Sequence, residues 1–446
     1  MVKSVDVAYV KIWDQVVGAV SWQGNPMEGY AVFEFDRTFL NTGLDLSPLH
    51  MSVESALRGD GRYLFSKRSE DPSRDTFMGL PGLLADCLPD KFGNRLIDMW
   101  LQRQGRDSSS FTPVERLCYT GSRGMGALEF VPTLNKKLSE STPVEIYRLV
   151  ELAQQITSER NALNVSVAED TEIDSDALLE IIRVGTSAGG ARAKAIVAMN
   201  NEGHIVSGQT RIPEGYEHWI IKFDGVTDLE LGASQDFGRI EYGYYLMAKE
   251  AGIDMPVCKL LGGKEGRAHF MIKRFDRENN DKIHMQSLCG LAHYDFNEAG
   301  MFGYEQAFGV MRTLRLSKAE AAQQFRRMVF NVVSRNQDDH TKNISFLMDR
   351  DGKWRLSPAY DVTYAHNPGG LWTNSHQMSI SGKRDGFELQ DLLVVGKSIG
   401  IPKPEVVVGE VVDAISRWDE FAKEAGVKKE TLNAIGATHR LSLTSS

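Results

Sequence analysis

The chain of 446 residues lacks long hydrophobic runs, clustered cysteines and an excess of basic residues. No stretch approaches the roughly 18 to 20 consecutive apolar residues that a helix needs to cross a bilayer. Residues 1–20 alternate apolar and polar side chains like a strand, and they contain neither the apolar core nor the small-residue cleavage site of a secretory signal. We therefore expect a cytoplasmic protein that does not associate with membranes.

The four cysteines are separated by about 30 residues or more, so no CxxC pair is available for zinc binding or redox chemistry. Buried free thiols are expected instead. The formal net charge of -9 argues against sequence-independent binding of nucleic acid by this chain alone. Any role at DNA would be indirect, through a basic partner.

What the sequence does contain is enough apolar residues for more than one hydrophobic core. A hydrophobic content of 42%, a charged content of 25% and 41 glycines are typical of a globular protein. The length predicts two or three folding units. We find neither an internal repeat nor a low-complexity segment.

The pattern of short strands and helices predicts three regions. Residues 1–136 alternate like short strands and then turn helical, which predicts a small α+β domain. Residues 137–277 combine helical stretches, a glycine-containing loop and strands, and residues 278–446 are mostly helical. In the third region Ser317 and Glu320 stand in capping-box register. Apolar residues then repeat at helical spacing, at Phe325, Met328, Val329, Val332 and Val333.

The stretch NQDDHTKN, residues 336–343, directly follows this predicted helix. In kinases the catalytic loop carries an aspartate, four intervening residues and an asparagine. Asp338 and Asn343 have this spacing and Asp339 misses it by one residue, so the spacing nominates Asp338 as the base and Asn343 as a magnesium ligand. Successive residues of an extended loop point apart, so Asp339 has no assigned chemistry and its substitution should be much milder.

A second aspartate strengthens this interpretation. The strands on either side of Asp351-Gly352 have the pattern of a β-hairpin, and Asp361 follows it, where it would supply a second oxygen ligand for magnesium. Upstream, the loop 185–194 would bring backbone amides to a triphosphate, and Lys222 would hold its phosphates. Each feature alone has a structural explanation: Asp-Asp-His loops form turns, and strand lysines extend into solvent.

The ordered set of motifs resembles the HipA family of bacterial serine/threonine kinases, the toxins of HipA/HipB-type toxin-antitoxin systems. The resemblance covers nearly the whole chain and is carried by LLADCLPDKFGNRLI, GSRGMGALEFVP, SAGGARAK, WIIKF, EYGYYLMAKEAGI, KRFDR, DDHTKN and RLSPAYDV. It implies a two-lobed, protein-kinase-like α+β fold, with a β-rich ATP lobe and a helical lobe, preceded by a small α+β domain. It also implies ATP and Mg²⁺ as cofactors, a HipB-like helix-turn-helix antitoxin as partner, and a protein substrate such as an aminoacyl-tRNA synthetase.

The resemblance also implies roles for single residues. Asp338 matches the catalytic base, Asn343 and Asp361 match the magnesium ligands, and Ser187 matches the autophosphorylated serine of the phosphate loop. A phosphate of about two negative charges on Ser187 would be expelled from beside the ATP phosphates, which would switch the enzyme off. The positions that match nucleotide contacts are Ala188, Gly189, Gly190, Ala191, Arg192, Lys194, Lys222, Lys273, Arg274, Phe275, His340, Lys342 and Tyr360, with residues 273–275 acting through their backbone.

One departure from the family lies in the phosphate loop, where Arg192 and Ala193 replace a Gln-Glu pair, so the outer contacts of the loop differ. Two other functions stay open at this point. One is a nucleotide-binding pseudokinase scaffold that acts as corepressor with a DNA-binding antitoxin. The other is a metal-dependent hydrolase built from Asp338, Asp339, His340, Asp361 and His366.

Overall fold

The computed structural model describes residues 4–65, 74–89, 91–103, 105–134, 142–163, 181, 184, 192–226 and 236–443. The chain forms two compact units, each built from several separate stretches of the sequence. The first unit consists of residues 1–235, 261–285 and 350–352. The second unit consists of residues 236–260, 286–349 and 353–446.

The first unit begins with an antiparallel five-stranded sheet in the order β4-β3-β2-β1-β5. Alternate residues of β1 are buried, as the sequence pattern predicts for a strand with one face on a core. The strands are β1 Val7–Ile12, β2 Gln15–Gln23, β3 Tyr30–Phe35, β4 Arg62–Leu64 and β5 Leu128–Val131. The helices of this region are α1 Arg37–Leu40, α2 Val53–Arg58, α3 Arg74–Phe77, α4 Gly82–Ala85, α5 Lys91–Arg103 and α6 Pro113–Thr120.

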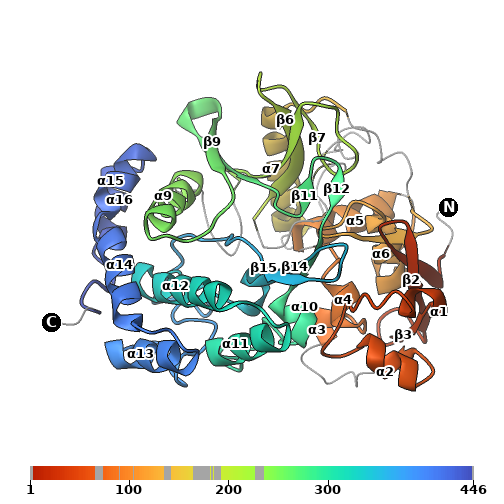
Figure 1. Ribbon diagram of the computed structural model, residues 1–446. Helices are drawn as coiled ribbons and strands as arrows, with labels where there is room; N and C mark the ends of the chain where they lie inside the picture. The colour runs from red at the N-terminus through yellow and green to blue at the C-terminus, as the bar shows by residue number, and fades with distance from the viewer. Residues whose placement is uncertain are drawn as a thin grey trace. The chain divides into compact units, whose positions relative to one another are not determined.

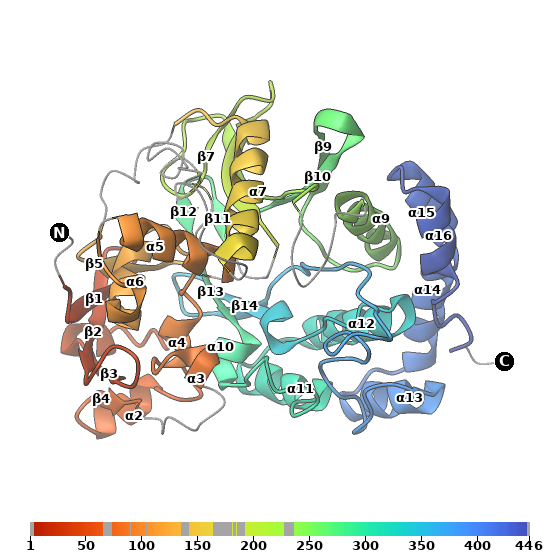
Figure 2. The same cartoon turned by 180° about the vertical axis from the view of Figure 1, so that it is seen from behind.

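A second five-stranded sheet has the order β7-β6-β8-β10-β9, and it lies in the first unit except for residues 258–260 at the start of β9. Its strands are β6 Lys194–Asn200, β7 Ile205–Ser207, β8 Tyr216–Lys222, β9 Cys258–Gly262 and β10 Ala268–Lys273. The helix α7, Ile146–Leu163, lies beside this sheet (Figure 2). Leu149 and Ala153 of α7 share a core with Trp219 and Ile221 of β8, and α5 contributes Trp100 to the same core.

The expected regions 1–136 and 137–277 therefore share one hydrophobic core, because α5 packs with the sheet that begins after residue 193. The chain also enters the second unit at residue 236, earlier than the expected start of the third region at residue 278. The small two-stranded ladder of β11 Arg277–Glu278 and β12 Asp281–Lys282 still belongs to the first unit.

The second unit is mainly helical, as expected. Its helices are α9 Phe237–Glu250, α10 Leu288–Ala292, α11 Tyr304–Thr313, α12 Lys318–Ser334, α13 Leu389–Ser398, α14 Pro404–Ser416, α15 Trp418–Glu424 and α16 Lys429–Gly436. Tyr244 of α9 is fully buried, packs edge-on against Phe330 and Trp418, and donates a hydrogen bond of 2.6 Å to the carbonyl of Ser334. This contact fastens α9 to the end of α12.

The helix α12 positions the acidic loop. Its predicted capping box between Ser317 and Glu320 is present, and the five apolar residues predicted for its inner face are all fully buried. The helix ends at Arg335, whose φ of 61° turns the chain out of the helix and into residues 336–343. The predicted hairpin follows, with β14 Ser345–Met348 antiparallel to β15 Trp354–Leu356 (Figure 1). The strand β13 His284–Ser287 pairs with the other edge of β14.

Two expectations drawn from composition can be compared with the fold. All four cysteines are buried and none forms a disulfide, as expected. In the part of the chain that the structure describes, no helix is both long enough and apolar enough to span a bilayer.

Candidate functional site

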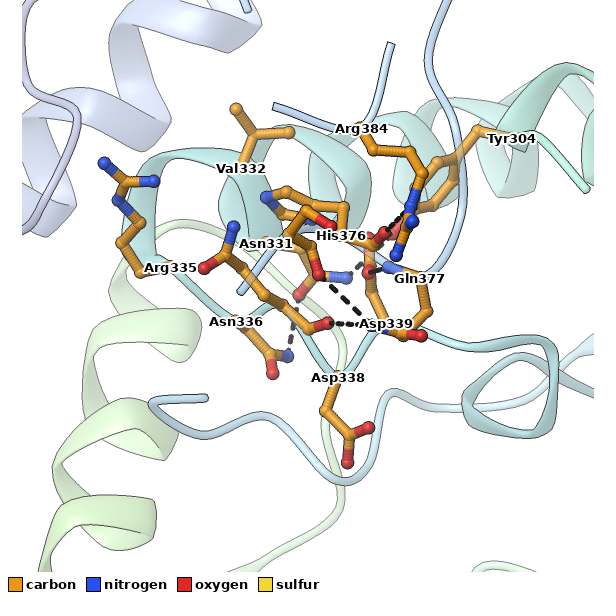
Figure 3. Close-up of polar contacts among 12 residues, drawn as sticks. Tyr304, Asn331, Val332, Arg335, Asn336, Asp338, Asp339, His376, Gln377 and Arg384 are labelled. Atoms are coloured by element: carbon orange, nitrogen blue, oxygen red, sulfur yellow. Dashed lines mark hydrogen bonds and ion pairs between the residues drawn. The ribbon is translucent and has the colours of Figure 1, made fainter. Parts of the chain in front are cut away.

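The two adjacent aspartates of the acidic loop point in different directions (Figure 3). The Asp338 side chain is 42% exposed, whereas Asp339 is buried at 3% exposure. The side chain of Asp338 extends away from the group of polar residues that surrounds Asp339. The loop therefore presents one carboxylate to solvent and buries the other, as the extended backbone of this stretch predicts.

One oxygen of the Asp338 carboxylate is held in place. The indole N–H of Trp372 donates a hydrogen bond of 2.6 Å to Asp338 Oδ1, and His340 Nε2 lies 3.8 Å from the same oxygen. The rings of Phe296 and Trp372 both lie near the His340 ring, with centroids 5.4 Å and 6.3 Å away. The Lys342 ammonium lies 4.4 Å from the centre of the Phe296 ring. Aromatic rings thus contact two residues of the loop itself, His340 and Lys342.

Asn343 orients the loop from its other end. Its side-chain Nδ2 donates a hydrogen bond of 2.7 Å to the backbone carbonyl of Asp338. Because the amide nitrogen is used in this way, the amide oxygen Oδ1 is the end of the side chain left for a cation, and oxygen is what Mg²⁺ prefers. The Tyr360 hydroxyl donates a hydrogen bond of 2.6 Å to the carbonyl of Lys342 and contacts the Ser345 hydroxyl, so Tyr360 braces the same loop.

Asn336 Nδ2 donates a hydrogen bond of 3.5 Å to the carbonyl of Asp361, and the segment after Asp361 pairs with the start of the acidic loop. Asn336 and Ala365 form a parallel bridge, in which Gln337 N donates to the carbonyl of Ala365. Asp361 itself has a φ of 52°, a left-handed conformation that costs about 1 kcal/mol or more for a residue with a side chain. Strained residues of this kind are concentrated at functional sites. The structure therefore brings Asp338, Asn343 and Asp361 into one part of the second unit.

Asp339 is the centre of a buried polar network (Figure 3). Its carboxylate accepts hydrogen bonds of 2.8 Å from the Tyr304 hydroxyl, the His376 ring and the Gln377 backbone N–H. Burial alone would raise the pKa of Asp339, but His376 and these hydrogen bonds lower it below its usual value. Burial and the nearby carboxylate raise the pKa of Tyr304 well above its usual value. The hydrogen bonds to Asp339 thus favour its ionised form despite its burial.

The geometry of Asp339 weighs against the hydrolase. Both of its oxygens accept hydrogen bonds, and His366 Nδ1 faces Gln337 Oε1, so neither side chain is directed at Asp338. Among the described residues, no three His, Cys, Asp or Glu side chains lie close enough together to hold a metal ion. A magnesium ion that also binds substrate phosphates needs fewer protein ligands than this.

Two of the expected phosphate contacts lie next to each other in the first unit. Lys194 begins β6 and pairs in register with Lys222 at the end of β8. Directly opposed residues of an antiparallel pair project from the same face of a sheet. The Lys222 ammonium lies 5.7 Å from the centre of the Phe270 ring, the residue opposite it on β10. Two cations on one face, at the end of the sheet that follows the glycine loop, favour an anionic ligand.

The segment expected to meet adenine has its side chains committed elsewhere. Arg274 is 3% exposed and donates to both oxygens of the buried Asp276, while Lys273 donates to Glu217 at 2.6 Å. The side chains of Lys273 and Arg274 are therefore occupied by these acidic partners. Arg192 and Phe275 are partly buried at the beginning of β6 and the end of β10. The remaining predicted loop residues, Ser187, Ala188, Gly189, Gly190 and Ala191, lie outside the described residues.

Four residues of this region were not identified from the sequence: Phe296, Tyr304, Trp372 and His376. Trp372 lies 34 positions after Asp338 and His376 lies 37 positions after Asp339, and no motif spacing connects either pair. The sequence around Trp372, NPGGLWTN, has the glycines and proline of a loop but no pattern that assigns the tryptophan a role.

Family models match most of the chain. The model described as the HipA N-terminal domain matches residues 8–131, and the model described as the HipA-like C-terminal domain matches residues 186–441. The second match alone covers more than half of the chain. The chain belongs to the HipA family. The resemblance inferred from the motifs is thus confirmed.

Three relatives of this HipA-family chain are informative. The HipA chain in a solved complex of HipA, HipB and operator DNA from Shewanella oneidensis has a TM-score of 0.61 at 16% identity, covering 96% of this chain and 94% of that one, which confirms the expected fold. A "Putative kinase" of Haemophilus influenzae is 22% identical over 45% of this chain and 67% of its own length. "Putative kinase Y4dM" of Sinorhizobium fredii is 26% identical over 32% of this chain and 36% of its own length.

Proposed function

We propose that this chain is an ATP- and magnesium-dependent protein serine/threonine kinase that acts as the toxin of a toxin-antitoxin system. The observation that carries the proposal is the loop geometry: a partly exposed Asp338 carboxylate with one oxygen held, and Asn343 bonded to its backbone carbonyl. The names of the two curated relatives support phosphate transfer. A general base needs this combination of access and fixed orientation.

In the proposed reaction the hydroxyl oxygen of a serine or threonine bonds to the γ-phosphorus of ATP. The bond to the bridging oxygen breaks, ADP leaves with the electron pair, and the hydroxyl proton passes to Asp338. Asn343 and Asp361 would hold magnesium, which supplies positive charge to the phosphates when bound. Lys194 and Lys222 would contact the phosphates directly, and His340, Lys342 and Tyr360 would line or brace the nucleotide site.

Transfer from labelled ATP tests the proposal. Wild type should label itself or a protein of a cell lysate, and Asp338→Asn should abolish labelling while ATP affinity stays within about twofold, since the base acts on the transition state. A wild type that binds ATP and labels nothing would support the pseudokinase scaffold instead. Retained transfer in Asp338→Asn would remove Asp338 from the role of base.

Regulation by autophosphorylation at Ser187 forms part of the proposal. Phosphate added there would lie beside the ATP phosphates and be repelled by them, so the phosphorylated chain should be inactive. Mass spectrometry of the purified wild type should find phosphate on Ser187, and Ser187→Ala should stay active longer during incubation with ATP. Phosphate on another residue, with none on Ser187, would contradict this role.

A helix-turn-helix antitoxin is the proposed partner, because the solved HipA structure is a complex with HipB and operator DNA. The formal net charge of -9 makes direct binding of this chain to DNA unfavourable. Gel-shift assays should therefore show binding to operator DNA only when the antitoxin is present. An aminoacyl-tRNA synthetase is the proposed substrate class, to be tested by phosphoproteomics after brief induction of wild type and of Asp338→Asn.

A further inference from the structure

The hydrogen bond between Trp372 and Asp338 is not explained by packing alone. An indole N–H can only donate, and here it donates over 2.6 Å to an ionisable oxygen. Hydrogen bonds to charged acceptors are shorter and about twice as strong as those between neutral groups. The bond therefore fixes the orientation of the carboxylate rather than merely filling space.

The two oxygens of Asp338 are thereby made different. Oδ1 is occupied by Trp372 and approached by His340. No group in the described part of the chain donates to Oδ2, and the side chain is 42% exposed. An aspartate carboxylate otherwise rotates over a broad range, so holding one oxygen also directs the other. Oδ2 is then the oxygen that can accept a proton from an incoming hydroxyl.

Trp372 is itself held by the buried network around Asp339. Gln377 Nε2 donates to the carbonyl of Trp372 at 2.5 Å, and Gln377 N donates to Asp339 Oδ1 at 2.8 Å. The loop that carries Trp372 is closed by a second hydrogen bond, from the backbone N–H of Asn367 to the carbonyl of Thr373. Through Gln377, Asp339 thus fixes the position of Trp372 relative to Asp338, the residue that precedes Asp339 in the chain.

We propose that Trp372 is a positioning residue for phosphate transfer, which holds Oδ1 of Asp338 so that Oδ2 meets the acceptor hydroxyl. This inference rests on the proposed kinase function. As the hydroxyl oxygen bonds to the γ-phosphorus and ADP leaves, the hydroxyl proton goes to Oδ2. Trp372 touches neither ATP nor the acceptor in this role and acts only through Asp338. Its loss should therefore lower kcat and leave the KM for ATP unchanged.

Trp372→Phe is the direct test, because it removes the N–H and keeps an aromatic ring. We expect kcat to fall about 10- to 100-fold, the effect of a misdirected catalytic group, with the KM for ATP within twofold of wild type. Combined with Asp338→Asn, the substitution should cause no further loss. An unchanged kcat would overturn the proposal, as would a rise in the KM for ATP as large as the fall in kcat. An increased kcat would also overturn it, because the contact would then be inhibitory.

Two control variants match this test. Trp13→Phe also removes an indole hydrogen bond, 2.8 Å to the carbonyl of Lys282 in the first unit, and should leave kcat unchanged. Leu371→Ala alters the fully exposed neighbour of Trp372 and leaves the hydrogen bond to Asp338 in place. It should leave the rate of autophosphorylation unchanged. A loss of kcat in Trp13→Phe equal to that in Trp372→Phe would show a general effect on folding and overturn the proposal.

An NMR measurement separates this inference from the kinase function. The seven tryptophans give seven indole N–H signals, and the one missing in Trp372→Phe belongs to Trp372. In Asp338→Ala this signal should move upfield, while the signal missing in Trp13→Phe should stay in place. If the Trp372 signal is the same in Asp338→Ala and in wild type, the contact is absent and the inference is overturned. The proposed kinase function of the wild type is not affected by that result. If the Trp372 signal moves in Asp338→Ala but the wild type transfers no phosphate, the contact exists and the kinase function is contradicted. The positioning role is then contradicted with it.

Discussion

Asp338 and Asp339 are adjacent in the chain, yet their carboxylates lie in opposite environments. Asp338 faces solvent with one oxygen bonded to Trp372, whereas Asp339 is buried and bonded to Tyr304, His376 and Gln377. The same chemical change at the two positions should therefore have two different consequences. At Asp338 it should remove chemistry, and at Asp339 it should remove stability.

Asp339→Asn should lower the free energy of unfolding of the second unit by about 2 to 3 kcal/mol, since hydrogen bonds to a buried charge are lost. Asp338→Asn, at a partly exposed position where the amide oxygen can still accept from Trp372, should change it by about 1 kcal/mol or less. Urea denaturation of the two variants beside wild type measures the difference. The sequence predicts that Asp339→Asn is much milder than Asp338→Asn. We expect this for the rate of phosphate transfer by the folded protein, but not for the free energy of unfolding. Equal stability of the two variants would contradict this assignment.

Arg440 should stabilise the acidic loop from the C-terminal side. It donates to the carbonyl of Val332 at 2.8 Å and to His376 Nε2 at 3.0 Å, and it pairs with Asp385. Since arginine only donates, His376 Nε2 accepts, and the proton on Nδ1 is the one donated to Asp339. Arg440→Met should therefore raise the unfolded fraction by leaving these groups unsatisfied, at a cost of about 2 to 4 kcal/mol.

A matched substitution at the surface is available for Arg440. Arg417 also forms two ion pairs, with Glu250 and Glu420, but its side chain is 45% exposed. Exposed ion pairs contribute about 0 to 1 kcal/mol, so Arg417→Met should barely shift the thermal midpoint. Thermal unfolding of both variants compares them directly. A larger loss for Arg417→Met than for Arg440→Met would show that the buried network is not the source of stability.

Asn343 should determine the magnesium requirement. Asn343→Ala removes both the amide oxygen and the hydrogen bond to the Asp338 carbonyl. We expect the magnesium concentration for half-maximal transfer to rise at least about tenfold, as is typical when ligand groups are lost. Titration of magnesium at saturating ATP measures this change. An unaltered magnesium curve with a lowered kcat would indicate that Asn343 only orients Asp338.

The buried ions of the first unit predict a loss of stability in acid. Asp276 accepts from Arg274 and Arg277, and all three are buried. Burial alone would raise the pKa of Asp276, but the two guanidinium groups hold it well below its usual value. Because the folded-state pKa is lower than the unfolded one, the stabilisation is complete above about pH 4 and is lost as the pH falls towards the folded-state pKa.

Asp276→Asn should therefore give a first unit that is about 3 to 5 kcal/mol less stable at neutral pH, since it leaves a buried charge unpaired. Its stability should also depend less on pH below about pH 4. Asp281→Asn is the control, because Asp281 is 80% exposed and its ion pair with Arg350 spans 3.4 Å at the surface. Denaturation at a series of pH values should separate the two variants, and parallel acid curves for Asp276→Asn and wild type would contradict the role of Asp276.

The helix α12 and the hairpin could be predicted from the sequence because their signals are local. The capping box at Ser317, the apolar spacing that follows it and the turn at Asp351-Gly352 each depend on residues a few positions apart. The division of the chain into units could not be predicted in the same way. Whether α5 packs with one sheet or another depends on contacts between residues more than a hundred positions apart.

The sequence by itself determined which residues of the site carry the chemical groups. The spacing of Asp338, Asn343 and Asp361 follows from local loop and hairpin lengths, and the family was recognisable from ordered motifs. Only the tertiary structure decided which oxygen of Asp338 is free, and that Asp339 is a buried structural ion. Trp372 and His376 reach the loop through folding of a distant segment, and no local spacing encodes such a contact, since the side chains meet only once the core has formed.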